Sequence, residues 1–565
     1  MTSITELEPT LQRVREGAHD WVALPLADKR ALLRAVRAST LEAAPAWVAA
    51  ACAVKGIDPN SPAAGEEWSS GPYALITMTS ALEKTLRTIE KGRSPLDEIE
   101  LGVAPGGRTT LGVYPYVAKD IVLQGYSAKL WLRPGVSLDQ ARRGIARALR
   151  DPQRQPRVTV VLGAGNITGI PALDILTALY QEASAVIVKL NPVNAAVGEA
   201  MTAAFAPLIE RGFVAITEGG HEVGAALIAH EAVDAVHLTG GRHSHDAIVW
   251  GSDDEADARR AASEPLLRKP ITSELGGVGP VIVVPDDGWT PENIDAVARD
   301  VATQRLHNSG FNCIATQVVV IPEAWKHADR FVEAVRLHLA DAPVRPAYYP
   351  GASSRQLAAV TMHPDAAVLG GDPNCPRTLI DGLDAESVDE HLFRVESFAP
   401  VLGVVRLPGS REPGIFLDAA VRFCNERLAG TLGAGISIHP TTIEALGERF
   451  HRAVSELHYG TIAINAWVGP VFGMPAGSWG AYPGGTLDDV GSGIGVVHNA
   501  LLLDPAHIER TVGEGPWVKS PTPLWYVDNR TAHITARRLT RFAGIDSWAI
   551  AAPLGAAALV SYQQG

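Results

Sequence analysis

The feature that most constrains the fold is a regular alternation of short apolar segments and helical patterns between residues 157 and 239. The segment 157–162 is an apolar run that ends in glycines, and a helical pattern precedes each later run of the same kind. Strands that alternate with helices are typical of βαβ units and a parallel sheet. The predicted strands are 157–162, 185–190, 213–217 and 235–239, and the predicted helices are 170–182, 195–211 and 222–230.

The same alternation resumes after Gly277 and predicts a second α/β block. Its predicted elements are a strand at 280–284, a helix at 291–306, a strand at 317–321 and a helix at 325–340. Leu and Val at helical spacing also predict helices over 9–54 and 66–92. Two β-prone segments, 109–118 and 127–133, are expected to form a small sheet outside the main fold.

Charge and cysteine usage exclude several classes of function. The net charge is −13 and the acidic residues are dispersed, which argues against a nucleic acid or an anionic membrane as partner. The four cysteines are widely spaced and form no Cys-x-x-Cys pair, so neither a disulfide framework nor a metal site is predicted.

The sequence also indicates a compartment. The N-terminus has no signal-peptide pattern, and no stretch reaches the roughly 20 apolar residues that a spanning helix needs, so a cytoplasmic protein is expected. The most apolar stretch, 548–562, is short and contains Pro553 and Gly555. We predict that it is a buried segment of the tail.

Two short motifs carry the chemistry. Cys313 ends the run Asn-Ser-Gly-Phe-Asn-Cys, and Glu274 stands in Ser-Glu-Leu-Gly-Gly, thirty-nine residues earlier. A thiol nucleophile and a carboxylate base suffice to form a thioester and then hydrolyse it. Cys52, Cys375 and Cys424 lie outside any such motif and are expected to be packing or surface residues.

Read in order, Glu-Leu-Gly-Gly followed by Asn-x-Gly-x-x-Cys resembles the motif pair of the aldehyde dehydrogenase superfamily. The resemblance covers about residues 9–495 and is firm between 157 and 470. It implies that Cys313 attacks the aldehyde and that Glu274 activates the water that hydrolyses the thioester. It further implies that Asn166 and the backbone N–H of Cys313 hold the oxyanion.

The resemblance also assigns residues to a nicotinamide cofactor, NAD or NADP. Lys189, at the end of a strand that reads Val-Ile-Val-Lys, would contact the ribose region. The segment 224–241 matches a family stretch whose final turn faces the cofactor phosphates. Glu396 would bind the nicotinamide ribose and Phe398 would pack against the ring. The cofactor-binding residues implied in this way are Lys189, Thr239, Gly240, Gly241, Leu275, Glu396 and Phe398.

The implied fold is aldehyde-dehydrogenase-like: a Rossmann-like cofactor domain, an α/β catalytic domain and a small oligomerisation sheet. The first domain would span 1–277, with 109–135 as the oligomerisation strands, and the catalytic domain would span 278–480. A return segment and an unassigned extension would follow at 481–565. A homodimer or homotetramer is expected.

Each motif also has a simpler interpretation. The stretch 163–169 follows a strand and opens a helix, which is the setting of a dinucleotide loop, but its glycine spacing is a weak match. Asn166 would serve equally as the N-cap of a helix. Gly240 and Gly241 alone fit an ordinary turn, and a lone glutamate such as Glu274 is commonly a solvated turn residue.

Several positions depart from the family pattern. Phe311 replaces the usual Gln, Gly163-Ala164-Gly165 replaces Pro-Trp, and His245 replaces a Gly. Pro192 stands where NAD-preferring members often place a Glu, so NADP remains an alternative cofactor. The tail after about residue 503 has no counterpart in the family pattern.

The sequence therefore predicts NAD(P)-dependent oxidation of an aldehyde to a carboxylic acid through a cysteine thioester. One alternative is a CoA-acylating aldehyde dehydrogenase or an acyl-CoA reductase, because the Gly165-Asn166 turn resembles acyl-CoA reductases of the luciferase system. Retention of Glu274 argues against that alternative, since transfer to CoA needs no water-activating base. A further alternative is a non-catalytic scaffold of the same fold.

Overall fold

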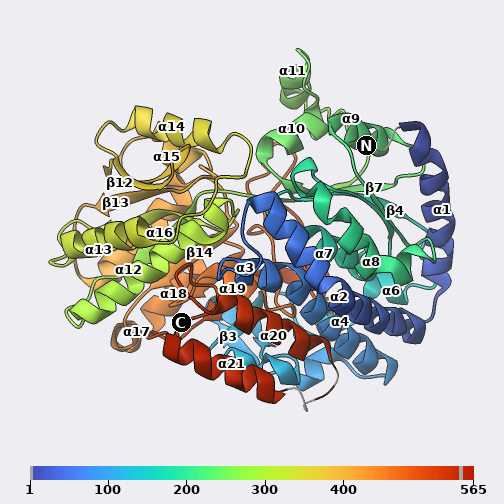
Figure 1. The fold of residues 1–565 in the computed structure, drawn as a ribbon, viewed down its shortest axis with the longest axis horizontal. Coiled ribbons are helices and arrows are strands. Elements are labelled where there is room, and N and C mark those ends of the chain that lie inside the picture. Colours follow the sequence, from blue (N-terminus) through green and yellow to red (C-terminus); the bar gives the residue numbers. More distant parts are fainter. Residues whose placement is uncertain (1–3, 546, 548–550, 565) are drawn as a thin grey trace.

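The computed structural model describes residues 4–545, 547 and 551–564 of the chain. It contains two β-sheets, one of six strands and one of eleven, with helices packed on their faces (Figure 1). Among the described residues, no helix is long and apolar enough to cross a membrane.

The six-stranded sheet has the order β16-β8-β7-β4-β5-β6. Its strands are parallel except for β16, which pairs antiparallel with β8. The strands are β4 (Val158–Leu162), β5 (Ala185–Lys189), β6 (Val214–Thr217), β7 (Ala235–Gly240), β8 (Ile271–Leu275) and β16 (Gly493–Ile494). The helices are α7 (Ile170–Leu176), which runs into a π-helical turn at Thr177–Gln181, then α8 (Gly198–Ile209), α9 (His221–Ala229), α10 (Arg242–Trp250) and α11 (Ala256–Ala261). The strands and helices predicted for 157–239 are confirmed.

The eleven-stranded sheet has the order β1-β2-β3-β17-β15-β14-β9-β10-β13-β12-β11. Its central strands are parallel, whereas β1, β2, β3 and β11 pair antiparallel with their neighbours. The strands are β1 (Leu101–Ala104), β2 (Arg108–Tyr114), β3 (Ser127–Leu132), β9 (Gly279–Val283), β10 (Thr316–Pro322), β11 (Ala367–Asp372), β12 (Cys375–Leu383), β13 (Val401–Leu407), β14 (Gly433–Ser437), β15 (Thr461–Ile464) and β17 (Ile508–Glu514). The longer helices around it are α12 (Pro291–Leu306), α13 (Ala328–Asp341), α14 (Ala352–Met362), α16 (Pro413–Arg427) and α18 (Glu448–Glu456).

The chain passes from the first sheet to the second between β8 and β9. This crossing lies at the predicted boundary near residue 277, although the full division into domains stays a prediction. The two β-prone segments near residues 110 and 130 do form strands, β2 and β3, but they do not form a separate sheet. The strand β17 pairs with β3 on one side and with β15 on the other, so it connects β2 and β3 to the rest of the large sheet. Sequence analysis assigned no strand to 508–514 and therefore missed this connection.

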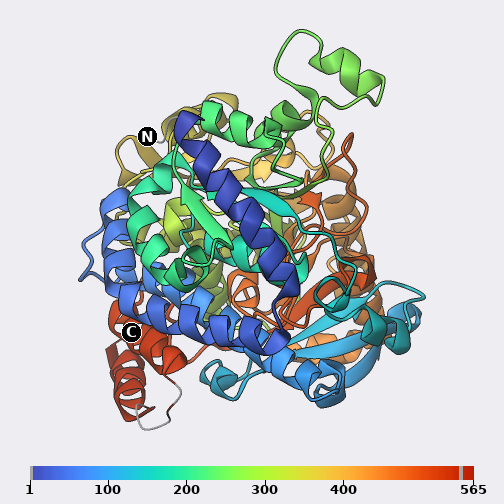
Figure 2. The ribbon, with the colours of Figure 1, turned by 90° about the vertical axis from the view of Figure 1, so that its right-hand side faces the viewer.

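A layer of N-terminal helices covers one side of the molecule. It comprises α1 (Ile4–Ala23), α2 (Leu26–Lys55), α3 (Ala64–Trp68), a π-helical turn at Ser69–Tyr73 and α4 (Ala74–Glu90). Helix α1 crosses the six-stranded sheet (Figure 2), and its buried Leu7, Leu11, Val14 and Ala18 pack against β4 and β5. This spacing gives the helix one apolar stripe.

The C-terminal extension forms two helices, α20 (Ala532–Gly544) and α21 (Ala551–Gln564). Helix α20 packs against α3, the π-helical turn and α4 (Figure 1). The prediction of a buried tail was wrong for the part that is described: α21 lies on the surface, and Tyr562 is 65% exposed. Residues 548–550 of that prediction lie outside the described residues. Short Ala side chains offer little apolar area to bury.

Candidate active site

Cys313 follows a tight turn between α12 and β10. Asn308, Ser309 and Gly310 all have positive φ, and the buried Arg305 guanidinium donates a hydrogen bond of 2.7 Å to the carbonyl of Gly310. A Cβ on Gly310 would lie 3.0 Å from the backbone of Ala399. The Asn-x-Gly-x-x-Cys motif therefore needs glycine at this position, because φ is positive and a side chain would crowd the neighbouring backbone.

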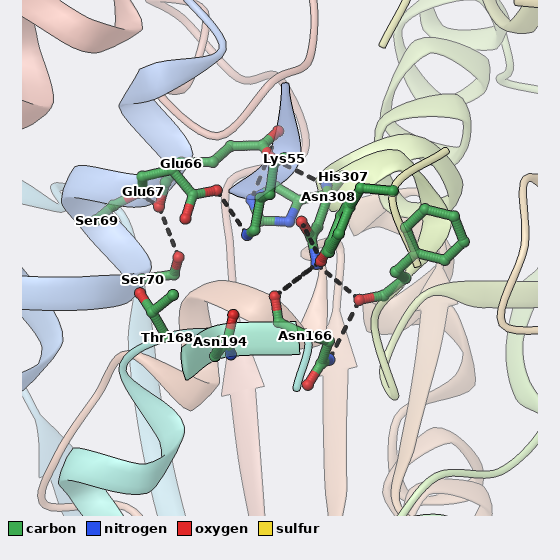
Figure 3. Close-up of polar contacts among 12 residues, drawn as sticks. Lys55, Glu66, Glu67, Ser69, Ser70, Asn166, Thr168, Asn194, His307 and Asn308 are labelled. Atoms are coloured by element: carbon green, nitrogen blue, oxygen red, sulfur yellow. Dashed lines mark hydrogen bonds and ion pairs between the residues drawn. The ribbon is translucent and has the colours of Figure 1, made fainter. Parts of the chain in front are cut away.

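Asn166 lies against this turn. Its side-chain Nδ2 donates to the carbonyl of Phe311 at 3.2 Å, and Asn308 Nδ2 donates to the carbonyls of Phe311 and Asn166 at 2.7 and 3.1 Å (Figure 3). The helix-cap interpretation of Asn166 was wrong, because α7 begins at Ile170 and its N-cap residue is Gly169. The amide of Asn166 has a second N–H that it can offer to a ligand.

A buried carboxylate supports the turn. Glu66, on α3, accepts a hydrogen bond of 2.9 Å from the backbone N–H of Asn308 (Figure 3). It also forms an ion pair of 2.5 Å with Arg345. The neighbouring Glu67 forms a buried ion pair of 2.7 Å with Lys55. Sequence analysis missed these residues, because their partners are distant in the chain and two adjacent glutamates carry no motif.

Glu274 lies at the end of β8, close to the thiol. Its Oε1 is 3.8 Å from Cys313 Sγ and accepts a hydrogen bond of 2.8 Å from the indole N–H of Trp479. The side chain is buried rather than solvated, which removes the turn-residue interpretation. Burial, followed by the charge of Asp174, raises the pKa of Glu274 to about 7. A carboxyl group with such a pKa can both accept and release a proton near neutrality.

A second buried group of polar residues lies beside Glu274. In the parallel register of β7 and β8, Thr239 faces Glu274 and His237 faces Thr272, so these side chains share one face of the sheet. Asp174, on α7, accepts a hydrogen bond of 2.9 Å from Thr239 and lies 3.5 Å from His237 Nε2. Burial lowers the pKa of His237, but Asp174, Glu274 and Glu182 together outweigh burial and the net shift is upward. Asp174 occupies an ordinary helical position, so sequence analysis had no signal for it.

The Cys313 thiol lies in an electrostatic setting that disfavours the thiolate. A reactive cysteine commonly has a polar, partly exposed position that favours the thiolate. The residue is partly exposed, yet burial and then the charges of Glu274 and Glu396 raise the pKa of its thiol well above the ordinary value. Glu274 is therefore placed to accept the thiol proton. Cys52, Cys375 and Cys424 are buried, which fits the packing role predicted for them.

One large cleft of about 1170 Å³ brings the predicted site residues together. It opens at the carboxyl ends of β4, β5, β7 and β8, where α/β proteins commonly bind ligands. The predicted residues that border it are Asn166, Lys189, Thr239, Gly240, Gly241, Glu274, Leu275, Cys313, Glu396 and Phe398. This is the complete set predicted from the sequence.

The cleft has groups that suit a dinucleotide. The first turn of α10, with Gly241 as its N-cap residue, borders it and presents backbone N–H groups. Lys189 adds an ammonium group, whose pKa is lowered by burial. Glu396 is partly buried, and its Oε1 atom is buried and has no hydrogen-bond partner among the described residues. A Cβ on Gly276 would collide with this carboxylate at 2.1 Å.

A second, narrower cavity of about 130 Å³ also reaches the thiol. Cys313 is the residue that borders both it and the large cleft. The thiol therefore stands between two spaces, one of which is large enough for a dinucleotide.

The comparisons with known proteins agree with this arrangement. The model of the aldehyde dehydrogenase family matches residues 169–363, which include both Glu274 and Cys313. This segment of the chain is similar to the aldehyde dehydrogenase family, and the similarity to the curated members is distant. N-succinylglutamate 5-semialdehyde dehydrogenase of Novosphingobium aromaticivorans is 30% identical over 186 residues, which are 33% of this chain and 35% of that protein. Geranial dehydrogenase of Castellaniella defragrans is 26% identical over 46% of this chain and 50% of that protein.

Solved structures of this family share the fold. NADP-dependent glyceraldehyde-3-phosphate dehydrogenase of Bacillus halodurans, complexed with NADP, has a TM-score of 0.58 at 17% identity and covers 90% of this chain and 91% of its own. Aldehyde dehydrogenase C of Pseudomonas syringae, complexed with NAD+ and octanal, has a TM-score of 0.59 at 14% identity and covers 93% and 91%. The alignment with the two curated relatives spans only half of their length or less.

Two departures from the family pattern have a structural reason in this chain. The ring of Phe311 is fully buried and packs against Tyr348, Tyr349 and Phe398, with ring centroids 5.2 to 5.9 Å apart. A Cβ on Gly165 would lie 2.6 Å from Asn191, so this turn has no room for a larger residue. The aromatic cluster and the close turn replace the usual Gln and Pro-Trp.

Proposed function

We propose that the protein oxidises an aldehyde to a carboxylic acid with NAD or NADP, through a thioester on Cys313. The observation that carries this proposal is the position of Cys313 between the two cavities, with Glu274 3.8 Å away. The names of the relatives support it, since the two curated proteins above are a semialdehyde dehydrogenase and a geranial dehydrogenase.

The chain's own groups supply the first step. Glu274 takes the proton of Cys313, and the sulfur forms a bond to the carbonyl carbon of the aldehyde. The resulting hemithioacetal oxygen carries negative charge, which the second N–H of Asn166 and the backbone N–H of Cys313 stabilise. A nicotinamide cofactor, when bound, would supply the hydride acceptor that the oxidation of the hemithioacetal to a thioester needs.

Glu274 serves again in the second step. After it has released the first proton, its carboxylate removes a proton from water, and the hydroxide attacks the thioester carbon. The carbon–sulfur bond breaks, the acid leaves, and the thiol is restored. The hydrogen bond from Trp479 fixes the carboxylate for both tasks.

The cofactor is held by residues that border the cleft. We propose that the pyrophosphate lies at Gly240, Gly241 and the first turn of α10, and that Lys189 and Glu396 bind the ribose groups. Leu275 and Phe398 would line the nicotinamide end. Because no carboxylate follows Lys189 at position 192, the cleft accepts NAD and NADP alike.

The test is nicotinamide reduction by the purified protein with a panel of aldehydes, using NAD or NADP, with and without CoA. Reduction that needs no CoA is the expected result. Activity only with CoA would reassign the chain to thioester transfer, and the lack of reduction with every aldehyde would favour the scaffold alternative.

The pH dependence of hydrolysis should follow Glu274. Hydrolysis needs the carboxylate, so the steady-state rate should rise with pH through about 7, the pKa of Glu274. The charge of Asp174 raises the pKa of Glu274 by more than His237 lowers it. Asp174→Asn removes that charge, so the midpoint of the pH–rate profile should move to lower pH. Asp139→Asn, which neutralises an exposed carboxylate on another helix, is the control. A midpoint that stays in place in Asp174→Asn would contradict this assignment.

A further inference from the structure

The narrow cavity beside Cys313 has walls from several distant parts of the chain. The π-helical turn contributes Tyr73, and the segment after β15 contributes Trp467 and Phe472. The C-terminal extension, which has no counterpart in the family pattern, contributes Leu524, Trp525 and Leu539. The extension is therefore part of the wall and not an appendage.

The serine and threonine hydroxyls that border this cavity are turned toward their own helices. Ser69 and Ser70 donate hydrogen bonds to the carbonyls of Gly65 and Glu66 at 2.8 and 2.6 Å. Thr77 donates to the carbonyl of Ala74 at 3.0 Å. Because these donors are engaged with backbone acceptors, the helices present mainly carbon to the cavity.

The indole N–H groups of two wall residues are engaged as well. Trp467 donates to the carbonyl of Ile314 at 3.1 Å, and Trp479 donates to Glu274 at 2.8 Å. Both rings belong to the lining of the cavity. Aromatic side chains in a cavity wall contact apolar groups over a large area.

No cationic side chain borders the cavity in the described part of the chain. Its acidic residue, Asp120, is buried and accepts hydrogen bonds of 2.6 and 2.8 Å from the backbone N–H groups of Tyr116 and Val117. His307 is neutral near pH 7, because burial lowers its pKa to about 4. A carboxylate or phosphate in this cavity would lose its water without gaining a counter-charge.

The extension is held in place on both flanks. Tyr526, next to Trp525, donates a hydrogen bond of 2.9 Å to Asp300, and Arg299 pairs with Asp528 at 2.7 Å. At the far end of α20, Lys119 Nζ donates to the carbonyls of Phe542 and Ile545, both at 2.5 Å. The wall is therefore fixed to the folded domains.

We propose that the C-terminal extension makes this protein selective for aldehydes with an apolar alkyl or aryl tail. The inference rests on the proposed function, because it takes Cys313 as the residue that bonds to the carbonyl carbon of the aldehyde. Leu524, Trp525 and Leu539 are the residues that set the limit on tail size. Aldehydes that carry a carboxylate, a phosphate or several hydroxyls are disfavoured, because most of the lining is apolar and no cationic side chain of the described residues borders the cavity.

The first experiment compares kcat/KM for straight alkanals from propanal to decanal with values for benzaldehyde, glycolaldehyde and succinic semialdehyde. We expect kcat/KM to rise about threefold to fourfold for each added CH₂ until the cavity is filled. Glycolaldehyde and succinic semialdehyde should be poor substrates. Equal or better oxidation of the two polar aldehydes would overturn this inference and leave the proposed function intact, whereas no oxidation of any aldehyde would reject both.

Variants then test the role of the extension. Leu539→Trp should lower the ratio of kcat/KM for octanal to that for propanal by at least about tenfold, because it fills the cavity. Trp525→Ala should move the optimum toward longer alkanals. Ile534→Ala changes the same helix at a position that is 39% exposed and serves as the matched control. An unchanged ratio in folded Leu539→Trp would refute the role of the extension.

A binding measurement does not depend on these variants or on turnover. In Cys313→Ala, with the cavity wall intact, calorimetric titration should detect binding of octanal and much weaker binding of succinic semialdehyde. Comparable affinities for the two aldehydes would contradict the apolar selectivity.

Discussion

Replacement of Cys313 by alanine should abolish aldehyde-dependent reduction of NAD or NADP. We expect a loss of at least about 10⁴-fold in kcat, because no other group in the site can form the thioester. The measurement is the initial rate of nicotinamide reduction with the best aldehyde of the panel. Cofactor binding, followed by fluorescence, should persist because the cleft keeps its other residues.

A matched control is Cys375→Ala. Cys375 is also a buried thiol, but it lies at the start of β12 and borders neither the cavity nor the cleft that meet at Cys313. This variant should retain catalysis. If Cys313→Ala reduced NAD or NADP at a rate similar to that of the wild type, the covalent mechanism would be wrong.

Replacement of Glu274 by glutamine should separate the two halves of the reaction. Gln is nearly isosteric and can still accept the hydrogen bond from Trp479, but it cannot take a proton. We expect one equivalent of NADH or NADPH per site to form, more slowly than in wild type, followed by a steady state slower by at least about 10²-fold. Rapid-mixing absorbance measurements at 340 nm would resolve both phases.

The control for that variant is Glu386→Gln, whose carboxylate is 80% exposed and far from the thiol in sequence and contacts. Trapped acyl-enzyme in Glu274→Gln should be visible as a mass increase on Cys313. An unchanged steady-state rate would reject Glu274 as the base, whereas rescue of turnover by added CoA would show that thioester transfer needs no carboxylate.

The sequence was sufficient to predict features that depend on local patterns. The spacing of apolar residues predicted the positions of β4, β5, β7 and the helices between them. The ordered motifs located ten residues that border one cleft, because motif spacing reflects the carboxyl ends of neighbouring strands. What these residues do chemically remains a proposal.

The features that sequence analysis missed depend on contacts between distant residues. Glu66 supports the turn before Cys313 by accepting a hydrogen bond from Asn308, 242 positions later in the chain. The spacing of apolar residues does not predict such a contact. Asp174 raises the pKa of Glu274, but it lies on a helix whose sequence is mostly apolar. The prediction of a buried tail was wrong because it inferred burial from an apolar composition, although Ala-rich helices can lie on a surface.

The pairing of β17 has a consequence for synthesis of the chain on the ribosome. The strands β2 and β3 are made early, but the strand that joins them to β15 comes only at residues 508–514. Until it emerges, two strand edges stay open to solvent and to other nascent chains. A ribosome-stalled chain that ends before residue 508 should therefore be cleaved by protease near residues 101–132, and protection of that region in the stalled chain would contradict this order of assembly.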